Sequence, residues 1–369
     1  MKRHNIITSV VVVGVAALVL SGCSTGGKGP VENDASDVPV FEDGKLLPLK
    51  DGFPSSALSL VVVDEAGSDD GIYARQVQEA AAAISPVDIK VLDRPEFGST
   101  YGAWEAIDWA GDQRGGDDGY LSTVVTLPGS TIDLLATPVA SDLGVTMESL
   151  NTILLTESVP YVIVTRSDAP WGDSFEEMLA YAKAHPGEVK YISRGPGAGP
   201  DLAMNNYANI AGVEFNTSVG GSHAEINTAI GAGAGDIAVT LPGAASPFIQ
   251  DGKVVLLTCT GNTNPCAANW GTEQPNAASV VGGIDNDPWG SNRGLIATHD
   301  IPESHRLWLE ALFQAATQSP DFVKARTSIP GVGMVELDKA GALELQKAAY
   351  ETAYDILDGL GQLAPGVKK

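Results

Sequence analysis

Three short loops built largely of glycine, alanine and serine carry the features that could bind an anion. They cover residues 66–71, 195–200 and 220–222. Each follows an apolar stretch that predicts a strand and precedes a stretch that predicts a helix. Such a loop exposes backbone N–H groups at the positive end of a helix dipole, which favours a carboxylate or a phosphate. The alternative is that each loop is only a tight turn between a strand and a helix.

Arg194 directly precedes the second of these loops and is the best-placed basic residue. No Lys or Arg occurs between Gly195 and Gly252. A guanidinium can bind a carboxylate through two parallel hydrogen bonds, so Arg194 is a candidate for the cation that meets an acidic ligand. A surface arginine paired with one of the many acidic residues is the alternative, and the sequence leaves both open.

The first loop carries charge of the opposite sign. Asp64, Glu65, Asp69 and Asp70 lie in it or beside it. Desolvated carboxylates repel an anion strongly, whereas carboxylates that face water repel it little. The backbone of this loop therefore fits an anion site, while its side chains disfavour one.

Composition and motifs exclude several other classes of protein. The 369 residues include 46 acidic and 22 basic side chains, and the net charge of -24 argues against nucleic-acid binding, which needs a basic face. The length favours two domains. No G-x-S-x-G, H-E-x-x-H or C-x-x-C motif occurs after residue 55. We therefore expect no enzyme, no metal site and no cofactor.

The first segment is typical of an export signal. A cationic start, Met1-Lys2-Arg3-His4, precedes an apolar run over residues 6–20 that is too short to span a bilayer comfortably. The run ends in Leu20-Ser21-Gly22-Cys23, which resembles the bacterial lipobox. We expect residues 1–22 to be a signal peptide, Cys23 to be lipidated and residues 23–55 to form a flexible tether. An uncleaved N-terminal anchor is the alternative.

Apolar and amphipathic stretches alternate along the remaining chain. Strands are expected over residues 58–63, 88–92, 120–127, 159–165, 189–193, 213–219, 237–241 and 254–259. Helices are expected over residues 72–84, 101–110, 175–184, 201–211, 223–230, 302–317 and 340–360. This order predicts an α/β fold with mostly parallel sheets flanked by helices, in which ligands bind at the carboxyl ends of the strands.

Several segments, in unbroken order from about residue 56 to about residue 351, resemble one family of receptors. Residues 60–75 resemble the first signature of the tripartite tricarboxylate transporter substrate-binding proteins, the Bug or TctC-like receptors. Residues 93–120 are similar to that family's "NRPGAGG…PDGYT" block, residues 181–187 to its "AKANPGK" segment and residues 193–202 to its "GSPGSGSHL" loop. Gly220-Gly221-Ser222 falls where the family has "YKGGA".

The resemblance implies a lipid-anchored solute receptor on the extracytoplasmic face of the cell membrane. Its fold would be a two-domain Venus flytrap, with residues 56–160 and 259–369 in domain 1 and residues 161–258 in domain 2. Such a protein captures a small organic acid between its domains and delivers it to the large and small membrane subunits of a tripartite permease. We expect a monomer. An exported sensor domain or an enzyme on the same scaffold is the alternative.

The candidate ligand-binding residues come from all three loops. In the family, backbone amides hold the ligand carboxylate, and the matching positions here are Ala66, Gly67, Ser68, Gly220, Gly221 and Ser222. The second loop adds Arg194, Gly195, Gly197 and Ala198. The family's tyrosine and lysine before the Gly-Gly are Ser218 and Val219 here, so the loops transfer better than the ligand class.

We predict a disulfide between Cys259 and Cys266. Once Cys23 carries lipid, these are the two thiols left in an exported chain, and the six residues between them are rich in turn formers. The closed loop is short, so the disulfide should contribute about 2–3 kcal/mol to stability. Mass spectrometry of the non-reduced protein should find both thiols blocked. Two free, alkylatable thiols, the alternative, would refute the pairing.

Overall fold

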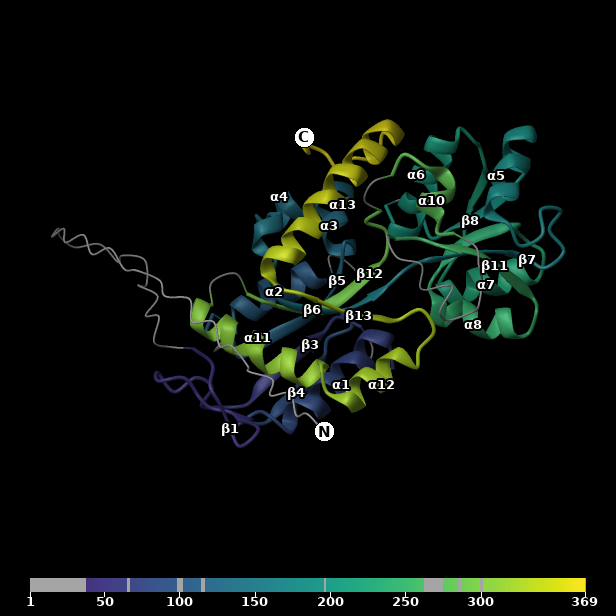
Figure 1. Ribbon diagram of the computed structural model, residues 1–369. Coiled ribbons are helices and arrows are strands. Elements are labelled where there is room, and N and C mark those ends of the chain that lie inside the picture. The colour runs from purple at the N-terminus through teal and green to yellow at the C-terminus, as the bar shows by residue number, and fades with distance from the viewer. Residues whose placement is uncertain are drawn as a thin grey trace, which may run out of the picture. The chain divides into compact units, whose positions relative to one another are not determined.

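The computed structural model describes residues 38–64, 67–97, 102–113, 117–195, 197–261, 275–284, 287–298 and 301–368. The chain divides into an N-terminal unit, Met1–Asp34, and a compact unit, Ala35–Lys369, and the helices and strands of the described residues lie in the second unit (Figure 1). The expected signal peptide and Cys23, Ala66 and Cys266 lie outside the described residues. The predicted disulfide therefore stays a prediction, although Cys259 itself is described and buried.

Six strands form one mixed sheet, in the order β13-β6-β12-β5-β3-β4. Their bounds are β3 (Leu58–Val62), β4 (Ile89–Asp93), β5 (Leu121–Leu127), β6 (Asn151–Val159), β12 (Ser291–Ala297) and β13 (Gly333–Leu337). Strand β3 is parallel to β4 and β5, whereas β12 is antiparallel to β5 and β6, and β13 is antiparallel to β6.

Five strands form the other sheet, in the order β11-β7-β10-β8-β9. They are β7 (Val162–Arg166), β8 (Lys190–Ser193), β9 (Asn216–Val219), β10 (Ile237–Thr240) and β11 (Val254–Cys259). Strand β8 is parallel to β9 and β10, while β7 is antiparallel to β10 and β11. Both sheets are thus mixed, which corrects the expectation of mostly parallel sheets. The chain passes from β6 to β7 without an intervening helix, so β7 enters its sheet in the opposite sense to β8 and β10.

Helices flank both sheets, as expected for an α/β fold (Figure 1). Those beside the six-stranded sheet are α1 (Asp69–Ala82), α2 (Ala103–Gly111), α3 (Gly129–Ala136), α4 (Val139–Leu143), α11 (Glu303–Thr317), α12 (Pro320–Thr327) and α13 (Lys339–Leu360). Those beside the five-stranded sheet are α5 (Phe175–Ala184), α6 (Gly199–Ala211), α7 (His223–Gly231), α8 (Pro242–Gln250) and α10 (Ala277–Val281). The short pieces β1 (Phe41–Glu42), β2 (Lys45–Leu46) and η2 (Met147–Ser149) complete the fold.

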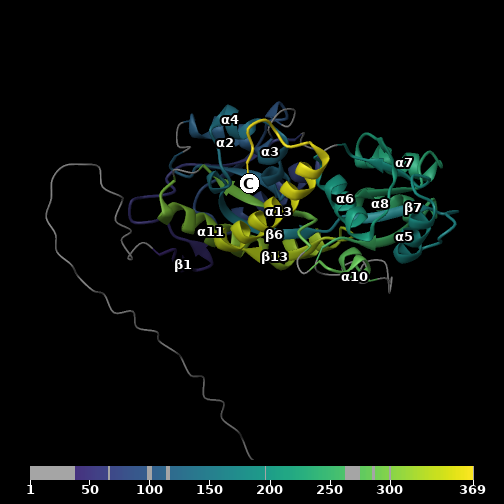
Figure 2. The same cartoon turned by 90° about the horizontal axis from the view of Figure 1, so that it is seen from above.

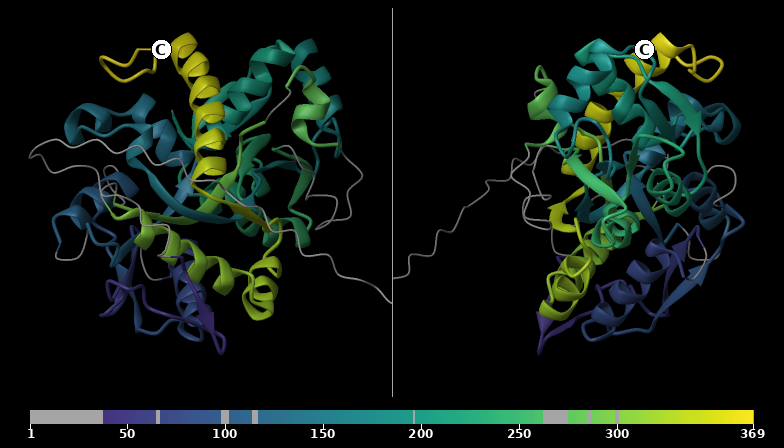
Figure 3. Two further views of the ribbon diagram at one scale, coloured as in Figure 1. Left: turned by 60° about the vertical axis from the view of Figure 1, so that its left-hand side comes forward. Right: turned by 90° about the vertical axis from the view of Figure 1, so that its right-hand side faces the viewer.

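Helix α13 connects the cores of the two sheets. It packs along α3 and reaches α6, so it runs between the helices of both sheets (Figures 2 and 3). Its buried Ala353 and Leu357 belong to the same apolar cluster as Tyr207 of α6. This shared core sets the two sheets side by side within one compact unit. Among the described residues, no helix combines the length and the apolar character needed to cross a bilayer.

Gly294 lets the central strand β12 lie close to β6. A Cβ at this position would overlap the carbonyl oxygen of Leu154 and lie 2.6 Å from the Cα of Leu155. Both obstacles are backbone, which cannot move aside without breaking the sheet. The pairing of β12 with β6 also shifts register next to Gly294, so the glycine accompanies a local irregularity of the ladder.

We predict that Gly294→Ala destabilises the protein by about 2–3 kcal/mol, because the added methyl overpacks the sheet. Urea unfolding measures the loss. Gly359→Ala in α13 is the matched control, since a Cβ there meets nothing within 4 Å. Equal stability of the two variants would contradict the close approach of the strands.

Candidate functional site

A cleft of ≈ 330 Å³ lies between the two sheets. The six-stranded sheet and its helices contribute Asp64, Asp69, Asp70, Thr126, Ser291 and Arg293. The five-stranded sheet and its helices contribute Tyr161, Arg194, Ala198, Gly199, Pro200, His223 and Leu241. Arg194 and Leu241 directly follow β8 and β10, and Asp64 is the second residue after β3. The cleft therefore lies at the carboxyl ends of these strands, where ligands bind in α/β proteins.

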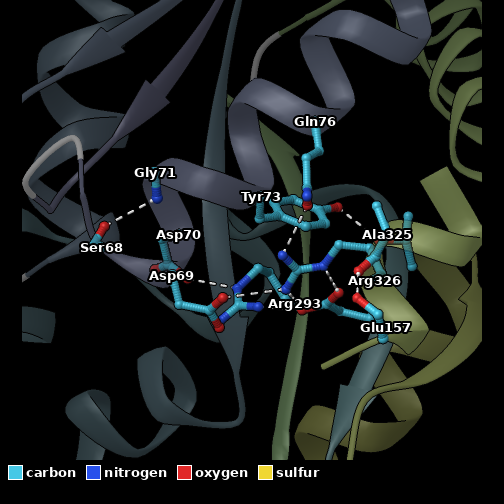
Figure 4. Close-up of polar contacts among 12 residues, drawn as sticks. Ser68, Asp69, Asp70, Gly71, Tyr73, Gln76, Glu157, Arg293, Ala325 and Arg326 are labelled. Atoms are coloured by element: carbon cyan, nitrogen blue, oxygen red, sulfur yellow. Dashed lines mark hydrogen bonds and ion pairs between the residues drawn. The ribbon is translucent and has the colours of Figure 1, made fainter. Parts of the chain in front are cut away.

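Arg293 of β12 forms the centre of a buried ionic network in one wall of the cleft. It is 4 % exposed. Its Nε donates a hydrogen bond to Asp70 Oδ1 (2.6 Å), and its Nη2 donates one to Asp69 Oδ2 (2.7 Å). Its Nη1 donates to Glu157 of β6 (Figure 4). Each of the three guanidinium nitrogens thus donates a hydrogen bond to a different carboxylate.

Arg326 of α12 completes the network. It is fully buried, and its Nε and Nη2 donate to the two carboxylate oxygens of Glu157, at 2.7 and 2.8 Å. Its Nη2 also lies 3.4 Å from Asp69. The ring of Tyr73 lies beside both guanidinium groups, 5.6 Å from that of Arg293 and 5.5 Å from that of Arg326. Burial raises the pKa of Tyr73, whose hydroxyl is hydrogen bonded to Thr156 (2.7 Å).

The network reduces the repulsion that the acidic first loop would exert on an anion. Asp69 and Asp70 begin α1, whose N-cap Ser68 accepts a hydrogen bond from the N–H of Gly71 (3.0 Å). Both carboxylates are paired with Arg293, which weakens their repulsion of a ligand at the opposite wall but leaves this wall with a net negative charge. Local sequence patterns do not show this pairing, because Asp70 and Arg293 are 223 positions apart.

The opposite wall holds a corner with a different character, formed by Arg194, Tyr161, His223 and the start of α6. We call it the Arg194 corner. Arg194 donates from Nη1 to the carbonyl of Gly221 (2.6 Å). Tyr161 covers the start of α6 so closely that a Cβ at Gly199 would lie 2.5 Å from the tyrosine hydroxyl oxygen. Helix α6 begins at Ala198 without a side-chain cap, so its dipole adds positive potential to the corner.

Electrostatics make Arg194 the charge that dominates this corner. Burial, and then the charge of Arg194, lowers the pKa of His223 to about 4, so this imidazole is neutral at pH 7. Its Nδ1 lies 3.1 Å from Thr240 Oγ1. Arg194 forms no ion pair among the described residues, whereas Arg293 is bound by carboxylates on three sides. Arg194 is therefore the basic residue of the described cleft that can take a ligand carboxylate.

The second loop serves mainly to turn the chain into α6. Gly195 has φ +116° and donates its N–H to Ser193 Oγ (2.9 Å). Gly197 has φ +80°, and a Cβ there would lie 3.1 Å from the Cβ of Ala136 at the end of α3. Both positions need glycine for backbone conformation. Of the candidates in this loop, Arg194 and Ala198 line the cleft.

Hydrogen bonds within the protein already use backbone N–H groups of the third loop. The N–H of Gly220 donates to the carbonyl of Ser193 (2.8 Å), and that of Ser222 donates to Glu225 Oε2 (2.6 Å). Ser222 Oγ accepts from the N–H of Glu225 in return, which makes a capping box at the start of α7. The Glu225 carboxylate thus occupies the place expected for a ligand anion. Gly220, Gly221, Ser222 and the first-loop candidates Gly67 and Ser68 are not part of the cleft lining, whereas their neighbours Asp69 and His223 are.

No group of His, Cys, Asp and Glu side chains in the described part of the chain is placed to hold a metal ion. The titratable residues of the cleft are instead bound to one another or face the corner of Arg194. The arrangement is suited to binding an anion rather than to activating a nucleophile.

We predict that Arg293→Met destabilises the protein by about 3–5 kcal/mol, because it leaves three carboxylates without their shared cation. Arg306→Met is the control: Arg306 is as buried, but its partners Glu303 and Glu310 lie on its own helix and both are partly exposed, whereas Glu157 in the Arg293 network is fully buried. That control should cost about 1 kcal/mol or less. Urea unfolding of both variants measures the difference, and equal losses would contradict a central role for Arg293.

Comparisons with known proteins agree with this architecture. The family model described as "Tripartite tricarboxylate transporter family receptor" matches residues 73–345. A protein of Cupriavidus necator, "UPF0065 protein in gbd 5'region", is 27% identical over 212 residues, which is 57% of this chain and 61% of that protein. The match thus spans less than two thirds of the relative's length.

Solved structures share the fold at low sequence identity. A TctC solute binding protein from Polaromonas has a TM-score of 0.67 and 20% identity, covering 83% of this chain and 99% of its own. An R. palustris protein determined with adipate has a TM-score of 0.65 and 16% identity, covering 85% of this chain and 99% of its own. The resemblance read from the sequence is therefore confirmed, and the chain belongs to the tripartite tricarboxylate transporter receptor family, with the α/β fold of periplasmic solute-binding proteins.

Proposed function

We propose that the protein captures a small organic acid in the cleft between its two sheets and delivers it to a tripartite permease with a large and a small membrane subunit. Membership of the receptor family supports the transport role. The observation that carries the carboxylate assignment is the Arg194 corner, where a guanidinium that has no carboxylate partner among the described residues lies beside the start of α6, which has no side-chain cap.

Two further features of the cleft support an anionic ligand. A guanidinium has five N–H donors. Among the described residues, Arg194 uses one nitrogen, Nη1, to donate to the carbonyl of Gly221, so other donors can bind a ligand. The low pKa of His223 keeps its ring uncharged, so the imidazole can accept or donate a hydrogen bond without adding charge. The ligand carboxylate would lie against Arg194 and the N–H of Gly199. Tyr161 would cover it.

The cellular setting is part of the same proposal. We propose that Cys23 carries the lipid that holds the protein at the extracytoplasmic face of the cell membrane, with the chain ahead of Val38 as the tether. The expected tether of residues 23–55 is too long, because residues 38–55 include β1 and β2 and bury Leu46, Leu49 and Phe53 in the core. The six-stranded sheet with its helices and the five-stranded sheet with its helices would be the two domains that close on the ligand. The second domain would then include α10, beyond the boundary expected at residue 258. The protein would act as a monomer and would bind its ligand without chemical change.

We predict that Arg194→Gln weakens carboxylate binding by about 1.5–3 kcal/mol, roughly tenfold or more in affinity, because it removes a charge-assisted hydrogen bond. Isothermal titration with a panel of mono- and dicarboxylates provides the measurement. Arg166→Gln is the control. Tyr161 lies just before the start of β7, whereas Arg166 is the last residue of that strand and is paired with Asp236. An affinity unchanged in Arg194→Gln would place the ligand elsewhere.

A further inference from the structure

The cleft continues into a second cavity with an apolar lining. This cavity measures ≈ 270 Å³ and shares Asp69, Leu241, Ser291 and Arg293 with the cleft. Beyond these, its wall is formed by Val159 at the end of β6, by Ile329, Pro330 and Val332 between α12 and β13, and by Gly243 and Ala244 of α8. We call it the apolar annex. A ligand that reaches past the Arg194 corner would enter an apolar space.

Among the described residues, the wall of the annex carries no cation that is free to bind a second carboxylate. The basic residue in its wall, Arg293, is already bound by Asp69, Asp70 and Glu157. A ligand carboxylate could reach that guanidinium only by displacing a carboxylate from a buried ion pair, which is costly. Arg293 therefore stabilises the fold and partly neutralises the acids, but it does not bind the ligand.

The acids on the same wall would repel a second carboxylate. Asp64, Asp69 and Asp70 all line the cleft, and Asp69 also lines the annex. In the ionic network three carboxylates, Asp69, Asp70 and Glu157, are paired with two guanidinium groups, those of Arg293 and Arg326. This wall therefore keeps a net negative charge, and the positive charge of the cleft is concentrated at Arg194 on the opposite wall.

We propose that the ligand is a monocarboxylate with an uncharged, apolar body, and that dicarboxylates are selected against. The inference rests on the proposed function and names its substrate class. The carboxylate binds at the Arg194 corner, and the body lies in the apolar annex against Val159, Leu241 and Ile329. Each methylene buried there contributes about fourfold in affinity, whereas a terminal carboxylate would have to be desolvated beside Asp69.

Two matched pairs of ligands test the inference by isothermal titration: hexanoate against adipate, and benzoate against terephthalate. In each pair one carboxylate is replaced by a methyl group or a hydrogen, so the body is conserved. We expect the monocarboxylate to bind at least about tenfold more tightly. A dicarboxylate that binds as tightly as its partner overturns the inference and leaves the proposed function standing. No measurable binding of any of the four overturns the carboxylate function itself.

Variants of the annex locate the apolar body. Ile329→Thr should weaken binding of the preferred monocarboxylate about fivefold, because it places a hydroxyl in the apolar wall. The matched control is Ile210→Thr, at an exposed position of α6, which should leave the affinity unchanged. Gly243→Leu provides a second variant, since a Cβ at Gly243 already lies 3.8 Å from Ile329 and a longer side chain would fill the annex. Unchanged affinity in both annex variants would overturn the placement.

Discussion

The burial of Arg293 among carboxylates is the interaction on which the rest of the cleft depends. Removing a guanidinium and a carboxylate from water costs several kcal/mol for each ion, and that cost is offset here because one arginine binds three acids and a second arginine shares two of them. The acids come from α1 and β6 and the arginines from β12 and α12. A single network therefore fixes the start of α1 against the middle of the sheet and sets one wall of the cleft.

This constraint divides the cleft into two walls with different roles. On one wall, charges are paired with one another and hold the structure. On the other, Arg194 has no carboxylate partner among the described residues, and the neighbouring imidazole of His223 is kept uncharged by burial and by that same arginine. The proposed carboxylate would therefore meet one effective positive charge, at the end of a helix dipole, and beyond it an apolar cavity. On this proposal Arg194 recognises the ligand, while Arg293 stabilises the fold.

Much of this architecture could be predicted from the sequence, because it depends on local patterns. Apolar runs and glycine-rich turns predicted β3, β8 and the start of α6, and the order of motifs indicated the family. Strand β12 was not predicted because Ser291-Asn292-Arg293 is polar although it is buried. Strand β6 was not predicted except for its last residue, Val159, which was joined to β7 across Pro160. The pairing of Arg293 joins distant segments, so no local pattern shows it. The closure of the third loop was readable, since Ser222 and Glu225 have the spacing of a capping box.

A crystal structure of the protein with a bound carboxylate tests the central claim most directly. If Arg293 is structural and Arg194 binds the ligand, the carboxylate oxygens will lie within hydrogen-bonding distance of the Arg194 guanidinium, and Arg293 will remain bound to Asp69, Asp70 and Glu157. A ligand carboxylate bound directly to Arg293, with one of those three acids displaced, would contradict the account.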